Sequence, residues 1–198
     1  MRYVALGDSY TIGTSVAAAD RWPDRLVAAL GPDEPTLELV ANLGVNGYTT
    51  ADLIRDELPA LSRLRPEFVS VLIGVNDVVQ AVPVAIHARN VERILDSLLT
   101  RVPAGRVLTV ATPDYTVTPA GADYGVPRRQ REAIAEVNAT MARLAGDRQI
   151  AFVDIVDLSL RVSGDLSLVA SDGLHPSGAQ YASWVERIEP VVAQLIGR

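Results

Sequence analysis

The segment Phe68-Val69-Ser70-Val71-Leu72-Ile73 is apolar at every position except Ser70, and the polar motif Gly74-Val75-Asn76-Asp77 follows it directly. A short apolar run that is rich in β-branched residues predicts a buried β-strand. Because apolar and polar residues do not alternate in this run, we expect both faces of its sheet to be covered, as in parallel sheets flanked by helices. The segment therefore favours an α/β fold.

The same alternation of apolar runs and helical patterns extends along the whole chain. Four further apolar runs predict strands at residues 3–6, 37–41, 107–111 and 150–155. The segments between and after them predict helices at residues 22–30, 50–61, 84–101, 128–145 and 176–196. We expect an interruption near Pro59 and a kink at Pro190, because proline lacks the N–H that a helix needs. We therefore predict a single domain over residues 1–198, an α/β/α three-layer sandwich of flavodoxin-like type with a five-stranded parallel sheet.

The bulk composition narrows the class of protein. The chain has 198 residues, of which 48% are hydrophobic and 21% charged, a profile typical of a compact globular domain. The net charge of −6 argues against nucleic-acid binding, because phosphate contacts need a basic surface. We expect the short basic cluster at residues 128–131 to be a solvated helix face. The absence of cysteine excludes disulfides, thiolate metal sites and a cysteine nucleophile.

The sequence carries no pattern of membrane insertion. No apolar run is long enough to span a bilayer, and residues 1–6 are too short to form a signal peptide. We therefore predict no integral membrane association and a cytoplasmic protein, unless a leader precedes this segment in the natural chain.

Polar motifs follow several of the predicted strands. They are Gly-Asp-Ser at residues 7–9, Asn-Leu-Gly at 42–44, Gly-Val-Asn-Asp at 74–77 and Asp-Gly-Leu-His at 172–175. In open parallel sheets, ligands bind outside the carboxyl ends of the strands. We therefore expect these four motifs, although far apart in the sequence, to meet at one rim of the sheet.

Two of these motifs contain the groups that acyl transfer needs. A serine hydroxyl is a weak nucleophile and needs a base within hydrogen-bond reach, which predicts Ser9 as nucleophile and His175 as general base. The other histidine, His87, lies inside a predicted amphipathic helix, where a partly buried structural role is expected. Asp172 precedes His175 by three residues and can hold one imidazole nitrogen, although an Asp-x-x-His pair alone also suits a plain turn before a helix.

Attack on an ester carbonyl creates an oxyanion, which needs fixed hydrogen-bond donors. The sequence offers the backbone N–H groups of Ser9 and Gly44 and the side-chain amide of Asn76. Each could be an ordinary turn residue when taken singly. Asp8 and Asp77 could form a second base or half of a metal site, but we favour the interpretation that they accept nearby backbone N–H groups. We predict neither a cofactor nor a metal.

The four motifs, in this order, resemble those of the SGNH hydrolases, also called the GDSL esterase/lipase family. The resemblance runs from Gly7 to Pro176 and implies a carboxylic ester hydrolase with Ser9 as nucleophile and Asp172 and His175 completing a catalytic triad. It also implies an oxyanion hole of Ser9, Gly44 and Asn76. One position departs from the family name, since Tyr10 stands where leucine is usual. We expect this change to affect packing or the shape of the acyl pocket.

Two alternatives and one further expectation remain open at this stage. The same site could transfer the acyl group to an alcohol, and the segment Gly7–Gly13 could instead form a phosphate- or nucleotide-binding loop, although it lacks the P-loop lysine. The loop at residues 112–127 is predicted either to overhang the site, with Tyr115 and Tyr124 as apolar walls, or to be a plain surface excursion. The family's substrates include short-chain acyl esters, lysophospholipids and acetylated sugars, so the resemblance implies a small-molecule ester of undetermined type.

Overall fold

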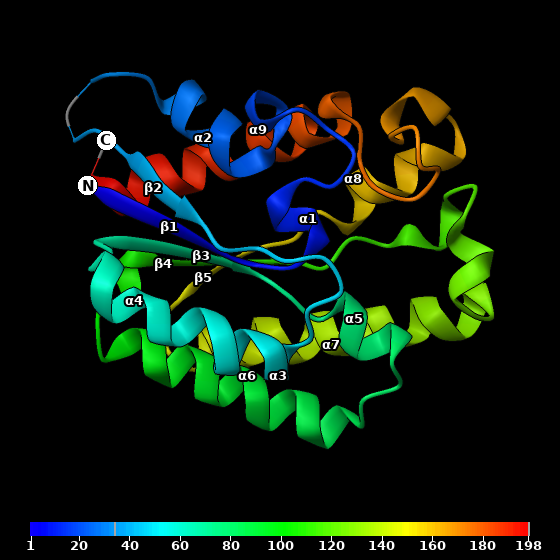
Figure 1. Ribbon diagram of the computed structural model, residues 1–198, viewed down its shortest axis with the longest axis horizontal. Helices are drawn as coiled ribbons and strands as arrows, with labels where there is room; N and C mark the ends of the chain where they lie inside the picture. The colour runs from blue at the N-terminus through cyan, green and yellow to red at the C-terminus, as the bar shows by residue number, and fades with distance from the viewer. Residues whose placement is uncertain (34, 198) are drawn as a thin grey trace.

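The computed structural model describes residues 1–33 and 35–197, and its centre is one parallel sheet (Figure 1). The sheet has the strand order β2-β1-β3-β4-β5, and every neighbouring pair is parallel. The strands are β1 (Arg2–Gly7), β2 (Glu38–Asn42), β3 (Phe68–Leu72), β4 (Val107–Val110) and β5 (Ala151–Val153). This is the order of flavodoxin-like folds, so the predicted fold class is confirmed.

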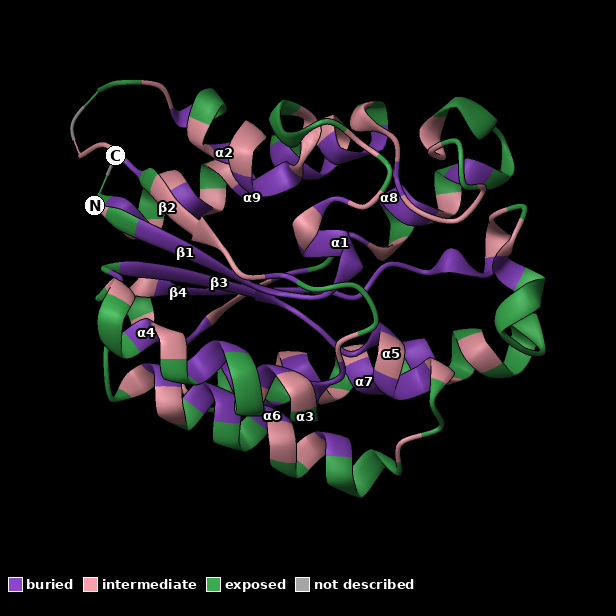
Figure 2. Cartoon of the chain, viewed as in Figure 1, coloured by how far each residue is buried: buried purple, intermediate pink, exposed green. Residues whose placement is uncertain are grey.

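Helices cover both faces of the sheet (Figure 1). One layer contains α2 (Trp22–Leu30) and α9 (Gly178–Ile196), which pack against each other. The other contains α4 (Leu58–Leu64), α6 (Val84–Leu99) and α7 (Pro127–Gly146). Figure 2 shows the sheet strands largely buried between the layers, with exposed residues on the outer sides of the helices.

Strand β1 shows why the molecule has two hydrophobic clusters. Successive side chains of a strand point to opposite faces of the sheet. Tyr3 and Ala5 accordingly belong to the cluster under α2 and α9, whereas Val4 and Leu6 belong to the cluster under α4 and α6. All four side chains are fully buried, which explains the unbroken apolar runs in the sequence.

The predicted helix at residues 50–61 is divided into three parts. Thr49 caps a short helix, α3 (Thr50–Asp52), through a reciprocal capping box with Asp52. A π-helical segment, Leu53–Glu57, precedes α4, and Pro59 lies in the first turn of α4. A proline is tolerated in a first turn, where its missing N–H costs little, so the irregularity falls just before Pro59.

Other boundaries differ more modestly from the predictions. Strand β5 is only three residues long, and α9 runs unbroken through Pro190. The loop at 112–127 contains two short 3-10 turns, η4 (Tyr115–Val117) and η5 (Gly121–Tyr124). Among the described residues, no helix is both long and apolar enough to cross a membrane.

Candidate active site

The nucleophile candidate lies at the carboxyl end of β1, where the chain turns sharply into a short helix. Ser9 begins α1 (Ser9–Ile12), and the carboxylate of Asp8 caps that helix by accepting the backbone N–H of Tyr10 at 3.0 Å. Gly7 has φ 149°, and a Cβ there would lie 2.1 Å from the carbonyl oxygen of Leu72. Only glycine lets β1 pass this close to β3, so the Gly-Asp-Ser motif is fixed by backbone packing as well as by chemistry.

One cavity brings several of the predicted residues together. It has a volume of about 230 Å³ and is lined by Ser9, Tyr10, Asn46, Gly47, Val75, Asn76, Val79, Tyr115, Tyr124, Leu174 and His175. Ser9, Asn76 and His175 come from three different motifs of the sequence. The prediction that these motifs meet at one rim of the sheet therefore agrees with the geometry.

Asp172 lies behind His175 and binds its imidazole. Asp172 Oδ2 is 2.7 Å from His175 Nδ1, and Asp172 Oδ1 accepts the backbone N–H groups of Leu174 and His175, each at 2.9 Å. Because a carboxylate only accepts hydrogen bonds, Nδ1 carries a proton, so in the neutral ring the lone pair is on Nε2. Burial alone would raise the pKa of Asp172, but the hydrogen bonds from Ser15, Leu174 and His175 together hold that pKa well below its usual range.

The two remaining oxyanion candidates have different surroundings. Asn76 lines the cavity, and its Nδ2 donates one hydrogen bond to the carbonyl oxygen of Tyr48 at 2.9 Å. Gly44 does not line this cavity but faces a neighbouring hollow that shares Asn46 with it. The N–H of Gly44 donates to Asn42 Oδ1 at 3.2 Å.

Gly44 nevertheless packs directly on the nucleophile segment. A Cβ at this position would lie 2.7 Å from the backbone nitrogen of Ile12 and 2.8 Å from the carbonyl oxygen of Asp8. Asn42 Nδ2 also donates to the carbonyl oxygen of Thr11 at 2.8 Å. The second motif is thus bound tightly to the first, with its glycine against the backbone around Ser9.

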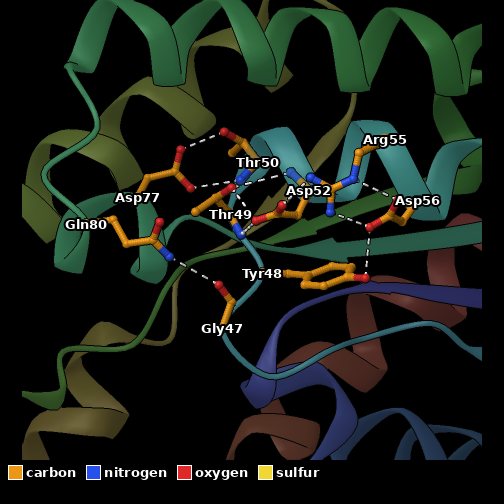
Figure 3. A network of polar contacts seen from close by, with 9 residues as sticks. All are labelled: Gly47, Tyr48, Thr49, Thr50, Asp52, Arg55, Asp56, Asp77 and Gln80. Carbon is orange, nitrogen blue, oxygen red and sulfur yellow. Dashed lines mark hydrogen bonds and ion pairs between the residues drawn. The ribbon is translucent and has the colours of Figure 1, made fainter.

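A set of polar contacts, which we call the α5 clamp, fixes the loop at residues 47–50 (Figure 3). Helix α5 (Val75–Val79) carries Asp77, whose carboxylate accepts the Thr50 N–H at 2.9 Å and the Thr50 hydroxyl at 2.6 Å. Gln80, just after α5, donates to the carbonyl oxygen of Gly47 at 3.4 Å. Together with the bond from Asn76 to Tyr48, these contacts hold one wall of the cavity against the helix that carries Asn76.

Asp8 and Asp77 both accept backbone N–H groups, which agrees with their expected structural role. His87 differs from its prediction, because its side chain is fully buried rather than partly buried. Its Nδ1 lies 3.3 Å from Asp77 Oδ1, and its ring packs beneath Gly74. His87 is absent from the cavity lining, so it supports the Asn76 motif from behind.

Aromatic side chains form much of the cavity wall. The ring centroids of Tyr10 and His175 are 5.4 Å apart. Tyr10, which stands where the GDSL motif has leucine, therefore contacts the general-base candidate. The loop at 112–127 contributes Tyr115 and Tyr124 to the cavity lining. Their rings meet edge to face, with their centroids 5.9 Å apart. This loop therefore overhangs the site and is not a plain surface excursion.

Two buried carboxyl groups lie behind the nucleophile. Glu57 Oε2 accepts the N–H of Gly7 at 2.9 Å, and burial raises the pKa of Glu57 to about 9. Burial also raises the pKa of Asp8 to about 8. Sequence reasoning missed Glu57, because a glutamate in a helical stretch gives no sign that a π-helical turn will direct it into the core.

Solved structures resemble this fold over nearly its full length. A member of the lipolytic protein G-D-S-L family from Veillonella parvula is 16% identical, with a TM-score of 0.78, covering 98% of this chain and 99% of that one. The psychrotrophic esterase EstA from Pseudoalteromonas is 16% identical, with a TM-score of 0.74 and coverage of 100% and 99%. A catalytic mutant of Axe2, an acetylxylan esterase from Geobacillus stearothermophilus, is 18% identical, with a TM-score of 0.72 and coverage of 99% and 94%.

At these identities the structural likeness concerns the fold alone. A search among curated proteins gives no match. The sequence model of the GDSL-like lipase/acylhydrolase family, however, matches residues 5–182, which include all four polar motifs. The chain therefore belongs to the GDSL-like lipase/acylhydrolase family.

Proposed function

We propose that this protein is a serine hydrolase that cleaves carboxylic esters through an acyl-enzyme on Ser9. The observation that carries the proposal is the arrangement of His175. Its ring lines the same cavity as Ser9, and its Nδ1 is bound to Asp172 at 2.7 Å. This arrangement leaves Nε2 as the acceptor for a proton from the cavity.

In the first step, Ser9 Oγ attacks the ester carbonyl while His175 Nε2 takes its proton. The carbonyl oxygen becomes an oxyanion, and the imidazolium is stabilised by the carboxylate of Asp172. His175 then gives the proton to the departing alcohol, which leaves an acyl group on Ser9. In the second step, water attacks the acyl carbonyl while His175 Nε2 takes its proton, and His175 then gives this proton to Ser9 Oγ as the bond to the acyl group breaks and the carboxylic acid leaves.

The oxyanion would be bound by the N–H groups of Ser9 and Gly44 and by the amide of Asn76. The amide of Asn76 has two N–H groups, and the bond to Tyr48 uses one of them. The N–H of Gly44 would have to exchange Asn42 Oδ1, at 3.2 Å, for the oxyanion. A negatively charged acceptor favours this exchange, because hydrogen bonds to ions are about twice as strong as neutral ones.

The composition of the cavity supports an uncharged acyl group. Its walls contain Val75, Val79, Leu174 and the two tyrosines of the overhanging loop, and among the described residues His175 is the only ionisable one in the lining apart from tyrosines. A volume of about 230 Å³ suits a short or medium acyl chain better than a long one. We therefore favour short-chain acyl esters, with lysophospholipids and acetylated sugars as the other candidates, and an acyl transferase with the same site as the alternative activity.

The test begins with covalent labelling. A fluorophosphonate should label the wild-type protein once, at Ser9, and Ser9→Ala should lose both labelling and nearly all esterase activity while keeping its melting temperature. Ser163→Ala, which removes an exposed hydroxyl far along the chain, serves as the control and should keep both. Labelling at another serine would show that the nucleophile is misassigned.

A series of nitrophenyl esters from acetyl to dodecanoyl then tests the acyl group. We expect kcat/KM to be highest for the shorter chains. Addition of an acceptor alcohol separates the two activities, because a transferase would form a new ester at the expense of the free acid.

A further inference from the structure

Ser15 has an unusual backbone conformation for its residue type. It lies in the exposed loop after α1 and has φ 67°, in the left-handed region. That region is unfavourable for a residue with a Cβ, whereas glycine occupies it freely. Gly13, two residues earlier, meets the same requirement with φ 70°. Position 15 therefore holds a strained serine where glycine would be unstrained, which directs attention to the contacts of the serine side chain.

The hydroxyl of Ser15 donates a hydrogen bond to Asp172 Oδ2 at 2.6 Å. The same oxygen lies 2.7 Å from His175 Nδ1, and the other carboxylate oxygen accepts two backbone N–H groups. The carboxylate therefore has four donors, which fill its capacity of about four lone pairs. Ser15 supplies the only one of these donors that comes from outside residues 172–175.

We propose that Ser15 is a positioning residue of the active site, whose hydroxyl fixes the plane of the Asp172 carboxylate and shares its negative charge with His175. This inference rests on the proposed role of His175 as general base. The two backbone N–H groups hold Oδ1 in place, but they leave Oδ2 held by His175 alone. With the Ser15 bond, Oδ2 has a second, fixed partner, so the imidazole is oriented by a rigid acceptor.

The bond also connects the two halves of the catalytic apparatus. Ser15 belongs to the loop that follows the nucleophile, and Asp172 is 157 residues away in the loop that carries the base. The phenols of Tyr10 and Tyr181 lie within the field of Asp172, and burial raises the pKa of each well above its ordinary value, so both stay neutral. Asp8 acts on both phenols, and Arg21 lines the same hollow as Ser15, but neither is hydrogen-bonded to the Asp172 carboxylate among the described residues.

The decisive variant is Ser15→Gly, because glycine keeps the left-handed backbone and removes only the hydroxymethyl group. We expect kcat to fall about five- to tenfold, the loss that corresponds to the net contribution of one hydrogen bond at a partly exposed site, with KM changed less than twofold. The melting temperature should stay equal or rise, since the strain is relieved. Ala17→Gly, in the same loop but without contact to Asp172, controls for added flexibility and should match the wild type.

Two further readouts separate positioning from a merely structural role. With one donor fewer, Asp172 exerts a stronger field on the imidazolium, so half-maximal kcat/KM should be reached at a higher pH in Ser15→Gly than in the wild type. The low-field proton resonance of the bond between His175 Nδ1 and Asp172 should also shift in Ser15→Gly and stay unchanged in Ala17→Gly. This resonance does not require turnover.

The outcomes distinguish this inference from the proposed function. An active wild type labelled at Ser9, with a Ser15→Gly variant of unchanged kcat, pH profile and proton resonance, would overturn the role of Ser15 and leave the proposed function intact. An inactive wild type, or labelling at another serine, would overturn the proposed function and this inference with it.

Discussion

Two carboxyl groups at the same rim of the sheet differ in their preference for a proton. Asp172 accepts four hydrogen bonds, and its pKa is held well below the usual range although burial opposes this. Glu57 accepts one hydrogen bond, from Gly7, and its Oε1 has no donor among the described residues. Burial therefore raises the pKa of Glu57 to about 9. Burial acts in the same direction on both groups, but the Glu57 side chain is much more deeply buried than that of Asp172, so the extent of burial and the number of donors together decide which one stays charged.

The difference bears on the proposed mechanism. The charged carboxylate lies beside His175, where that mechanism forms an imidazolium, and the protonated one lies behind Ser9, close to Gly7. A negative charge behind Ser9 would oppose the proposed oxyanion. Four donors keep Asp172 ionised at a more exposed place, whereas deep burial with one donor keeps Glu57 neutral.

The largest expected effect comes from removing the charged group. Asp172→Asn should reduce kcat/KM on the order of a thousand- to ten-thousandfold, because the imidazole loses both its orientation and its counter-charge. The acidic limb of the remaining activity should move to lower pH, since the imidazolium is no longer stabilised. A pH–rate profile measures both, with Asp147→Asn at an exposed position as the control. A variant that keeps more than a tenth of the wild-type activity would remove Asp172 from the mechanism.

The next effect concerns Glu57 and is seen in stability rather than in turnover. The folded protein keeps this carboxyl protonated up to about pH 9, whereas the unfolded chain loses the proton above the ordinary pKa of 4.5. The folded state therefore binds one proton more in this window, and the free energy of unfolding falls as the pH rises, by up to about 1.4 kcal/mol per pH unit. Glu57→Gln mimics the protonated form and should flatten this dependence, so that the variant exceeds the wild type in stability at alkaline pH.

Urea unfolding at several values between about pH 5 and about pH 9 tests this expectation. Glu92→Gln, on the exposed side of α6, is the matched control and should keep the wild-type slope. Equal slopes for the wild type and Glu57→Gln would mean that Glu57 is ionised in the folded protein, and the contrast with Asp172 would disappear.

The last effect is expected at Asp8, because burial raises its pKa to about 8. Asp8→Asn keeps an acceptor for the Tyr10 N–H and should flatten the pH dependence of stability up to about pH 8, above which Asp8 itself ionises in the folded protein. A charge on Asp8 raises the pKa of Glu57, so the two groups are coupled. The double variant should therefore change the pH dependence of stability by less than the sum of the changes in the two single variants. Full additivity would show that the two groups titrate independently.

The fold and the main residues of the site could be predicted from local patterns. The apolar run of β3 and the motif after it are continuous in sequence, so the strand and the place of Asn76 follow from periodicity and the geometry of parallel sheets. The triad candidates His175 and Asp172 are three residues apart, and their bond is a short-range contact.

The residues that the sequence did not reveal depend on long-range contacts. Ser15 reaches Asp172 across 157 residues through a strained turn that no local pattern specifies. The Glu57 side chain points into the core because of a π-helical segment. The full burial of His87 depends on how α6 packs beneath Gly74. Such contacts are set by tertiary packing, which overrides local propensity.

The α5 clamp has a consequence for the redesign of this protein. The segment that carries Asn76 is bound to the loop at residues 47–50, of which Gly47 lines the cavity, so enlarging the cavity there would also move the amide proposed to bind the oxyanion. The tyrosine wall is different, since Tyr115 and Tyr124 meet through an edge-to-face ring contact, and the buried Tyr115 hydroxyl has no partner among the described residues. We therefore expect substitutions at these two positions to change the preferred acyl group with a smaller loss of turnover, and a library aimed at bulkier acyl groups should be confined to them.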